Sequence, residues 1–233
     1  MEKVLLEIID FLGNHITNIA YDPTEIFDII NLCQDLTSEY DESHNLEHHI
    51  CVYKNAIKIL ASENKDVYQI SMQEYQELFL LITYSSLLHD TIDLKYPNNL
   101  EYKIKKLNLF LEEKIKDSCE KIKWIINNMS YSKEIKFGYP INSDKIIQLG
   151  RDIVSDSDKL EAIGEIGIQR CRQYIMVIHP NASEEEIIRY EVEHCDDKLS
   201  KLKDYFIRTN TGKKLAEPHH QVLVDFVKKN RQQ

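Results

Sequence analysis

Apolar residues recur at spacings of three and four along nearly the whole chain, and this pattern constrains the fold more than any other feature. Such spacing places apolar side chains on one face of an α-helix, which has 3.6 residues per turn. Only six glycines and five prolines interrupt the 233 residues. A chain of this length buries roughly 70% of the surface that its unfolded form exposes, so one core needs no metal or disulfide to hold it. We therefore predict an all-α fold, a single-domain helical bundle.

Local start and stop signals divide this pattern into helices. Asp22 before Pro23 predicts a helix over 23–39, and Ser71 with Glu74 has the spacing of a capping box ahead of a helix that runs into His89-Asp90. Residues 130–142 show little periodicity and contain a glycine and a proline, so we expect a loop there. The remaining helices are expected to begin near Val4 and Ser43, over 100–112 and 116–129, near 143 and 160, over 183–208, and after Pro218.

The charge balance, the cysteine spacing and the length of the apolar stretches each argue against certain ligands or locations. Lys and Arg number 29 against 39 Asp and Glu, a net charge of -10, which disfavours binding to a nucleic acid backbone. The short basic clusters at 103–106 and 213–214 are interpreted as solvated helix faces. Five scattered cysteines without a Cys-x-x-Cys pair indicate neither disulfides nor a thiolate zinc site. No stretch approaches the roughly 18 apolar residues of a membrane helix, so we expect a cytoplasmic protein.

Several histidines and aspartates could supply metal ligands. A single histidine at the end of an apolar helix is more often a structural residue than a ligand. His89 and Asp90 are more informative, because neighbouring helical residues point about 100° apart and do not normally both face one core. A buried carboxylate beside Leu87 and Leu88 is costly unless a cation compensates it, although an aspartate turned to solvent would also explain the pair.

The order of these histidines and aspartates along the chain is similar to that of the motif residues in a known family. The set His48, His89-Asp90 and Asp158 resembles the HD-domain metal-dependent phosphohydrolases. Four separate blocks resemble the small stand-alone subgroup of this family, namely residues 43–48, 87–96, 156–167 and 211–216. The resemblance covers roughly residues 40 to 230 and implies an all-helical bundle. We expect an HD-type domain over 41–233, with 1–40 as a helical extension packed on it.

The resemblance implies that His48, His89, Asp90 and Asp158 hold one divalent metal ion. Two imidazoles and two carboxylates suit Mn, Fe, Co, Ni or Zn, and the sequence does not choose among these and Mg. Asp156 is the rival of Asp158 as a ligand, and is otherwise expected to orient a ligand.

The histidines before the first ligand are interpreted from their spacing. His44 and His48 stand four residues apart and share a helical face, so His44 is a further candidate for contacts to the metal ligands. The segment lacks the His-Glu-x-x-His pattern, so a metalloprotease is discounted. His49 faces elsewhere and is expected to be a partly exposed helical histidine.

The resemblance also implies roles in catalysis for two residues after the His-Asp pair. Asp93 follows Asp90 by about one helical turn and is expected to act as general acid or base, with a solvated helix-end residue as the alternative. Lys95 is expected to hold a substrate phosphate as a point charge, with a surface lysine as the alternative. The ion would supply a metal-activated water for attack on a phosphate ester or anhydride.

We therefore expect a metal-dependent phosphohydrolase acting on a small phosphate substrate, such as a nucleotide, with no nucleic acid duplex and no membrane as partner. Asn45 and Cys51 depart from the subgroup, which usually has Asp and frequently Arg at these positions. Such departures leave open a catalytically silent nucleotide or metal sensor. A di-iron oxygenase, to which His44 would add a ligand, is the third hypothesis. The exposed edges of the amphipathic helices are compatible with a homodimer.

Overall fold

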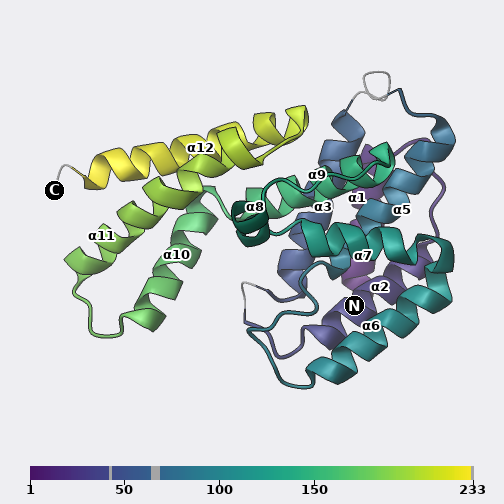
Figure 1. Ribbon diagram of the computed structural model, residues 1–233, viewed down its shortest axis with the longest axis horizontal. Helices are drawn as coiled ribbons and strands as arrows, with labels where there is room; N and C mark the ends of the chain where they lie inside the picture. The colour runs from purple at the N-terminus through teal and green to yellow at the C-terminus, as the bar shows by residue number, and fades with distance from the viewer. Residues whose placement is uncertain (42–43, 64–68, 232–233) are drawn as a thin grey trace. The chain divides into compact units, whose positions relative to one another are not determined.

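The computed structural model describes residues 1–41, 44–63 and 69–231, and every regular element in these ranges is helical. The all-α prediction is therefore confirmed. The α-helices are α1 (Glu2–His15), α2 (Pro23–Leu36), α3 (Leu46–Ser62), α5 (Met72–Leu88), α6 (Leu100–Ile115), α7 (Cys119–Asn128), α8 (Tyr131–Phe137), α9 (Lys145–Glu161), α10 (Gly164–Ile178), α11 (Glu184–His194) and α12 (Asn210–Asn230). Figure 1 shows their course.

The capping hydrogen bonds predicted at two helix starts are present in the structure. Asp22 accepts a hydrogen bond of 2.8 Å from the main chain of Thr24 at the start of α2. Ser71 and Glu74 form a complete capping box on α5. Asn45 caps α3 by accepting from the main chain two and three residues further on. The predicted start of this helix at Ser43 lies outside the described residues.

The structure consists of two compact units, Met1–Ser155 and Asp156–Gln233, whose boundary falls inside α9. Residues 1–40 belong to the first unit together with the helices that follow them. In this unit α5 packs against α2, α3 and α7, and α1 packs against α3. The buried residues of α5 lie on all sides of the helix, as expected of a helix surrounded by others. In the second unit α10, α11 and α12 contact one another.

Three predicted elements differ from the observed ones. The segment 130–142 is not all loop, because Tyr131–Phe137 form α8. The helix predicted over 183–208 is interrupted: α11 ends at His194, and π-helical turns follow at Cys195–Leu199 and Leu202–Phe206. Pro218 lies inside α12 rather than before it.

The tertiary structure explains two of these differences, the presence of α8 and the position of Pro218 inside α12. Glu134 of α8 is buried because it pairs with the guanidinium of Arg151 on α9, at 2.7 Å. Pro218 removes a hydrogen bond to the carbonyl of Lys214, but both residues are exposed, so water can satisfy that carbonyl.

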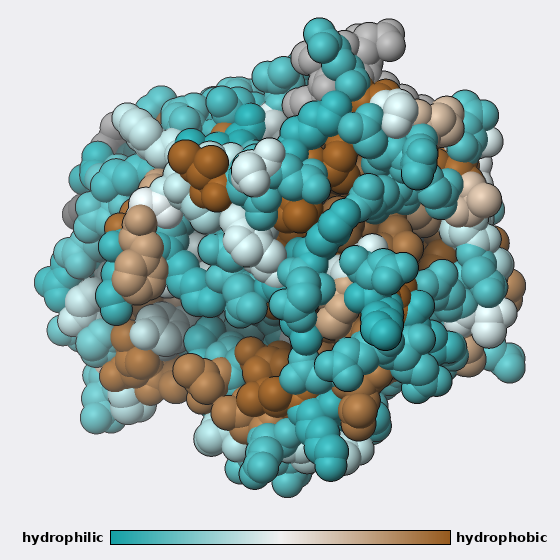
Figure 2. Space-filling model, turned by 45° about the vertical axis from the view of Figure 1, so that its right-hand side comes forward, coloured by the Kyte–Doolittle hydropathy of each residue, from teal (hydrophilic) through white to brown (hydrophobic). Residues whose placement is uncertain are grey.

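The surface and the cysteines agree with the composition. The face shown in Figure 2 is mostly hydrophilic, with hydrophobic side chains gathered in smaller groups. The described residues include all five cysteines, and none of these is in a disulfide. No helix among the described residues is both long and apolar enough to cross a lipid bilayer. Lys103 contradicts the interpretation of its cluster as a solvated face, since its residue is only 5% exposed.

Candidate functional site

The imidazoles of His48 and His89 meet inside the first unit. His48 lies in the first turn of α3, and His89 directly follows the last residue of α5. Their Nε2 atoms are 3.2 Å apart, and both residues are buried. The packing of α3 against α5 brings together two histidines that are 41 residues apart in the sequence.

The hydrogen bonding of His89 decides which of its nitrogens is available. Its Nδ1 lies 2.8 Å from the carbonyl oxygen of Ser86. A carbonyl only accepts hydrogen bonds, so in the neutral ring Nδ1 carries the proton and Nε2 presents a lone pair toward His48. Anchoring of the remote ring nitrogen by a carbonyl is the arrangement commonly found around metal-binding histidines.

Asp158 completes a group of three with the two histidines. A carboxylate oxygen of Asp158, near the end of α9, and one nitrogen from each of His48 and His89 all lie within 4.8 Å of one another. Three of the four predicted ligands are thus brought together.

The donor set fits a metal ion. Two imidazole nitrogens bound to one ion at about 2.0–2.1 Å, with an angle of roughly 90–110° between them, lie about 2.8–3.4 Å apart. The observed separation of 3.2 Å between the Nε2 atoms falls in this range. His48, His89 and Asp158 would hold the ion through two nitrogens and an oxygen, as expected for a first-row transition metal.

Asp90 is placed differently from the other three predicted ligands. Its Oδ2 lies 3.6 Å from Nε2 of His89, and its side chain is 41% exposed. Among the described residues it is not a member of the group formed by His48, His89 and Asp158. Asp90 as a metal ligand therefore stays a prediction.

Asp156 has a different role from Asp158. It is fully buried, and its carboxylate accepts hydrogen bonds of 2.7–3.0 Å from the main chain of Arg208 and Thr209 and from the Thr209 hydroxyl. Burial raises the pKa of Asp156 to about 6, and these hydrogen bonds act in the opposite direction. Asp156 thus fixes the turn before α12.

Asp93 and Lys95 lie in the turn that follows His89. Asp93 Oδ1 accepts a hydrogen bond of 2.8 Å from the Lys95 main chain, and its Oδ2 lies 3.7 Å from Lys95 Nζ. The Asp93 side chain is 18% exposed and that of Lys95 is 68% exposed. The carboxylate is therefore held in place while the ammonium is accessible to a ligand.

The Nε2 atom of His44 lies near these two residues, while its ring makes an edge contact with the ring of His48, at 6.3 Å between centroids. Its Nε2 lies 3.3 Å from Lys95 Nζ and 3.9 Å from Asp93 Oδ2. Its Nδ1 lies 3.3 Å from Asp41 Oδ1 and 3.3 Å from the hydroxyl of Tyr96. An ammonium close to Nε2 opposes the binding of a cation by that atom.

Sequence reasoning missed two groups of residues near this site. His49 was expected to be partly exposed, but it is fully buried with its ring centroid 4.6 Å from that of His89. Burial, reinforced by the neighbouring histidines, lowers the pKa of His49 well below its ordinary value. Tyr40 and Tyr96, which stack at 4.0 Å, were also missed. Two tyrosines 56 residues apart carry no sequence signal of their contact.

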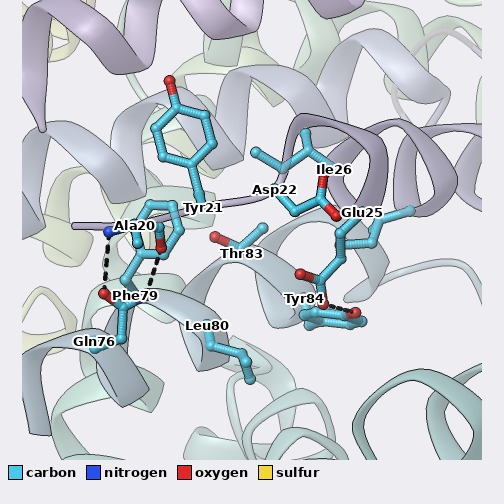
Figure 3. Close-up of a pocket in the computed structure, with 11 residues that line it drawn as sticks. Ala20, Tyr21, Asp22, Glu25, Ile26, Gln76, Phe79, Leu80, Thr83 and Tyr84 are labelled. Atoms are coloured by element: carbon cyan, nitrogen blue, oxygen red, sulfur yellow. Dashed lines mark hydrogen bonds between the residues drawn. The ribbon is translucent and has the colours of Figure 1, made fainter. Parts of the chain in front are cut away.

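The first unit also contains a small cavity and an open groove, and Tyr40 is among the residues that line the groove. A cavity of about 50 Å³ lies between α2 and α5, with Tyr21, Glu25, Phe79 and Thr83 among its walls (Figure 3). A larger open groove of about 700 Å³ runs along α3 and is lined by Asn45, among others. None of the predicted catalytic or metal-binding residues lines either one.

Comparisons with known proteins identify sequence relatives and solved structures that share the fold of this chain. No family model matches the chain. The sequence is 28% identical over 161 residues to the Bacillus subtilis protein YpgQ. The aligned region covers 68% of this chain and 74% of YpgQ. It is 30% identical over 169 residues to a protein of Acanthamoeba polyphaga mimivirus, covering 65% of this chain and 63% of the viral protein. The chain thus spans less than two thirds of that viral relative.

Two crystal structures share the fold. A hydrolase of the HD superfamily from Bacillus thuringiensis superposes with a TM-score of 0.60 at 24% identity, covering 88% of this chain and 94% of the hydrolase. YpgQ in complex with ADP superposes with a TM-score of 0.60 at 20% identity and the same coverage.

Proposed function

We propose that this chain, which has the fold of the HD-superfamily hydrolases, is a metal-dependent hydrolase of phosphate esters or anhydrides with a nucleotide as substrate. The convergence of His48, His89 and Asp158 within 4.8 Å carries this proposal. These residues offer two nitrogens and an oxygen from distant parts of the sequence, and the shared fold supports the same interpretation.

A divalent ion held by His48, His89 and Asp158 would polarise a phosphoryl oxygen and lower the pKa of a bound water toward neutrality. Asp93 would accept or return a proton at its carboxylate, which is partly exposed and held by the Lys95 main chain. The exposed ammonium of Lys95 binds the substrate phosphate, and His44 and Asp93 hold it in position.

The nucleotide part of the proposal is supported by a relative. The YpgQ structure that shares this fold contains ADP. The substrate of this chain is therefore sought first among nucleoside di- and triphosphates.

The two alternative hypotheses receive less support from the geometry. Asn45, whose presence suggested a silent pocket, caps α3 and accepts from the main chain of His48, so it serves the local structure of the site. His44 would be the extra ligand of a di-iron centre, but its Nε2 lies 3.3 Å from the ammonium of Lys95.

The proposal is tested by elemental analysis of the purified protein together with a panel of nucleotides and phosphoesters in the presence of Mn²⁺, Co²⁺, Ni²⁺, Zn²⁺ or Mg²⁺. We expect one divalent ion per chain and metal-dependent release of phosphate or pyrophosphate. His89→Ala serves as the background control, because a contaminating phosphatase would be equally active in that preparation. A protein that binds no divalent ion under any of these conditions would contradict the proposal.

A further inference from the structure

Tyr40 connects the segment between α2 and α3 to the turn that carries Asp93. Its residue is 8% exposed, and its hydroxyl donates a hydrogen bond of 2.9 Å to the carbonyl of Thr91. The main-chain N–H of Asp93 points to the same hydroxyl at 3.5 Å. One phenol from a distant part of the sequence therefore binds the main chain on both sides of residue 92.

The ring of Tyr40 is held on its two faces. Tyr96 stacks on it with a centroid distance of 4.0 Å and an interplanar angle of 17°. The ammonium of Lys103 lies 4.2 Å from the centroid of the Tyr40 ring. A stacked ring and an ammonium at these distances cannot occupy the same face, so Lys103 and Tyr96 lie on opposite faces.

The contact of Lys103 with this ring is strengthened by its surroundings. The Nζ atom is buried and has no hydrogen-bond partner among the described residues. A cation removed from water is attracted to an aromatic face more strongly than one at the surface. Lys103 therefore supports the side of Tyr40 that faces away from Tyr96.

The turn fixed in this way contains the proposed proton-transfer residue. Asp93 is followed by Lys95, whose main chain donates to the Asp93 carboxylate at 2.8 Å, so the position of the main chain sets that of the carboxylate. Tyr96 closes the same turn by donating a hydrogen bond of 2.6 Å to Asp41. Both ends of the turn are thus attached to the segment before α3.

We propose that Tyr40 is a positioning residue of this site, whose hydroxyl and clamped ring hold the 91–96 turn so that Asp93 meets the substrate in a fixed geometry. This inference rests on the proposed hydrolase function. A displacement of about 1 Å at a reacting group can cost roughly 100-fold in rate, so loss of the hydroxyl is expected to lower kcat by about 10- to 100-fold. KM changes less, because Tyr40 does not itself touch the substrate.

The test uses the full chain with Tyr40→Phe, which keeps the ring between Tyr96 and Lys103 and removes only the hydroxyl. Tyr75→Phe is the matched control, since Tyr75 is also buried and its hydroxyl donates to the carbonyl of Leu60 at 3.3 Å. Amide hydrogen exchange at Asp93 is measured by NMR together with kcat and KM. In Tyr40→Phe we expect the Asp93 amide to exchange about 10-fold faster or more, because it loses its acceptor. Tyr75→Phe should leave both the exchange rate and kcat unchanged.

Unchanged exchange at Asp93 in Tyr40→Phe would overturn the inference, as would equal effects in the two variants. Faster exchange with an unaltered kcat would overturn the catalytic part of it. The exchange measurement needs neither metal nor substrate. A wild-type protein without phosphohydrolase activity would therefore refute the proposed function, while the exchange data would still report on the contact of Tyr40 with the turn.

Discussion

At the scale of single residues, the arrangement of His48 and His89 is defined by a main-chain contact. The carbonyl of Ser86 holds Nδ1 of His89 at 2.8 Å, which leaves Nε2 facing its counterpart on His48 at 3.2 Å. Two imidazole lone pairs in this position repel each other unless a proton or a cation lies between them. A divalent ion would satisfy both nitrogens and the carboxylate of Asp158 at once.

His89→Ala is expected to weaken metal binding severely. Even an outer hydrogen-bonding partner of a ligand typically contributes 10- to 100-fold to affinity, so loss of a ligand should cost at least roughly 100-fold. Calorimetric titration of the metal-free protein with Mn²⁺ or Zn²⁺ measures this. His179→Ala, which removes an exposed histidine of the second unit, should leave the affinity unaltered. Equal affinities of the His89→Ala and wild-type proteins would exclude His89 as a ligand.

Asp93→Asn separates metal binding from catalysis. A positioned general acid or base contributes about 10²- to 10⁴-fold, and the amide cannot take up a proton. We expect turnover to fall by such a factor while elemental analysis finds the same metal content as in the wild type. Full turnover in this variant would remove Asp93 from the mechanism.

At the scale of elements, α5 positions the site because it is surrounded by α2, α3 and α7 and ends directly before His89. Its start is fixed by the capping box of Ser71 and Glu74. In the same unit, α8 is held to α9 by the buried pair of Glu134 and Arg151. The guanidinium also donates to the Asn128 carbonyl at 2.9 Å, which ties the end of α7 to the same pair.

The capping box makes a testable contribution to stability in acid. The main chain of Ser71, followed by Lys145 and the Ser71 hydroxyl, lowers the pKa of Glu74 from 4.5 to about 2. A carboxyl with a lowered pKa stabilises the folded state fully above its unfolded pKa and loses this contribution as the pH falls. The contribution of Glu74 should therefore disappear between about pH 4.5 and about pH 2.

Glu74→Gln carries a side chain that does not titrate, so its melting temperature should fall less steeply over this pH interval than that of the wild type. Thermal unfolding followed by circular dichroism at several pH values measures the difference. Glu101→Gln, in the exposed first turn of α6, is the control. Parallel curves for the wild type and Glu74→Gln would show that the capping box does not contribute through its charge.

At the scale of the whole molecule, each of the two units has its own stabilising contacts. In the second unit the carboxylate of Asp156 accepts hydrogen bonds from the main chain of Arg208 and Thr209 and thereby fixes the start of α12. Gly212 has no room for a side chain there, because a Cβ atom would lie 2.8 Å from Asp156 Oδ2. The geometry of this turn is therefore specified by buried polar contacts.

Asp156→Asn should destabilise this unit selectively. The amide replaces one acceptor oxygen with a donor, which leaves a buried N–H without a partner at a cost of about 1–3 kcal/mol. Amide hydrogen exchange resolved by segment should become faster in α11 and α12, whereas α5 should keep its protection. Faster exchange confined to α5 would contradict this assignment.

The sequence by itself determined the all-α class, most helix starts and the set of candidate ligands. Helical periodicity, N-caps and the adjacent His89 and Asp90 depend on neighbours within a few residues, so they can be read locally. The resemblance to the HD-domain family also came from the sequence alone, through the order of the four motif blocks. Substrate identity and oligomeric state stay predictions.

Only the tertiary structure decided which of these candidates meet and what surrounds them. It distinguished Asp158, which joins the histidines, from Asp156, which binds the main chain before α12. It also buried His49 and Lys103 and placed Tyr40 against the turn of Asp93. These outcomes depend on contacts between residues far apart in the chain, whose energies are set by burial and hydrogen-bond geometry and leave no periodic signal in the sequence.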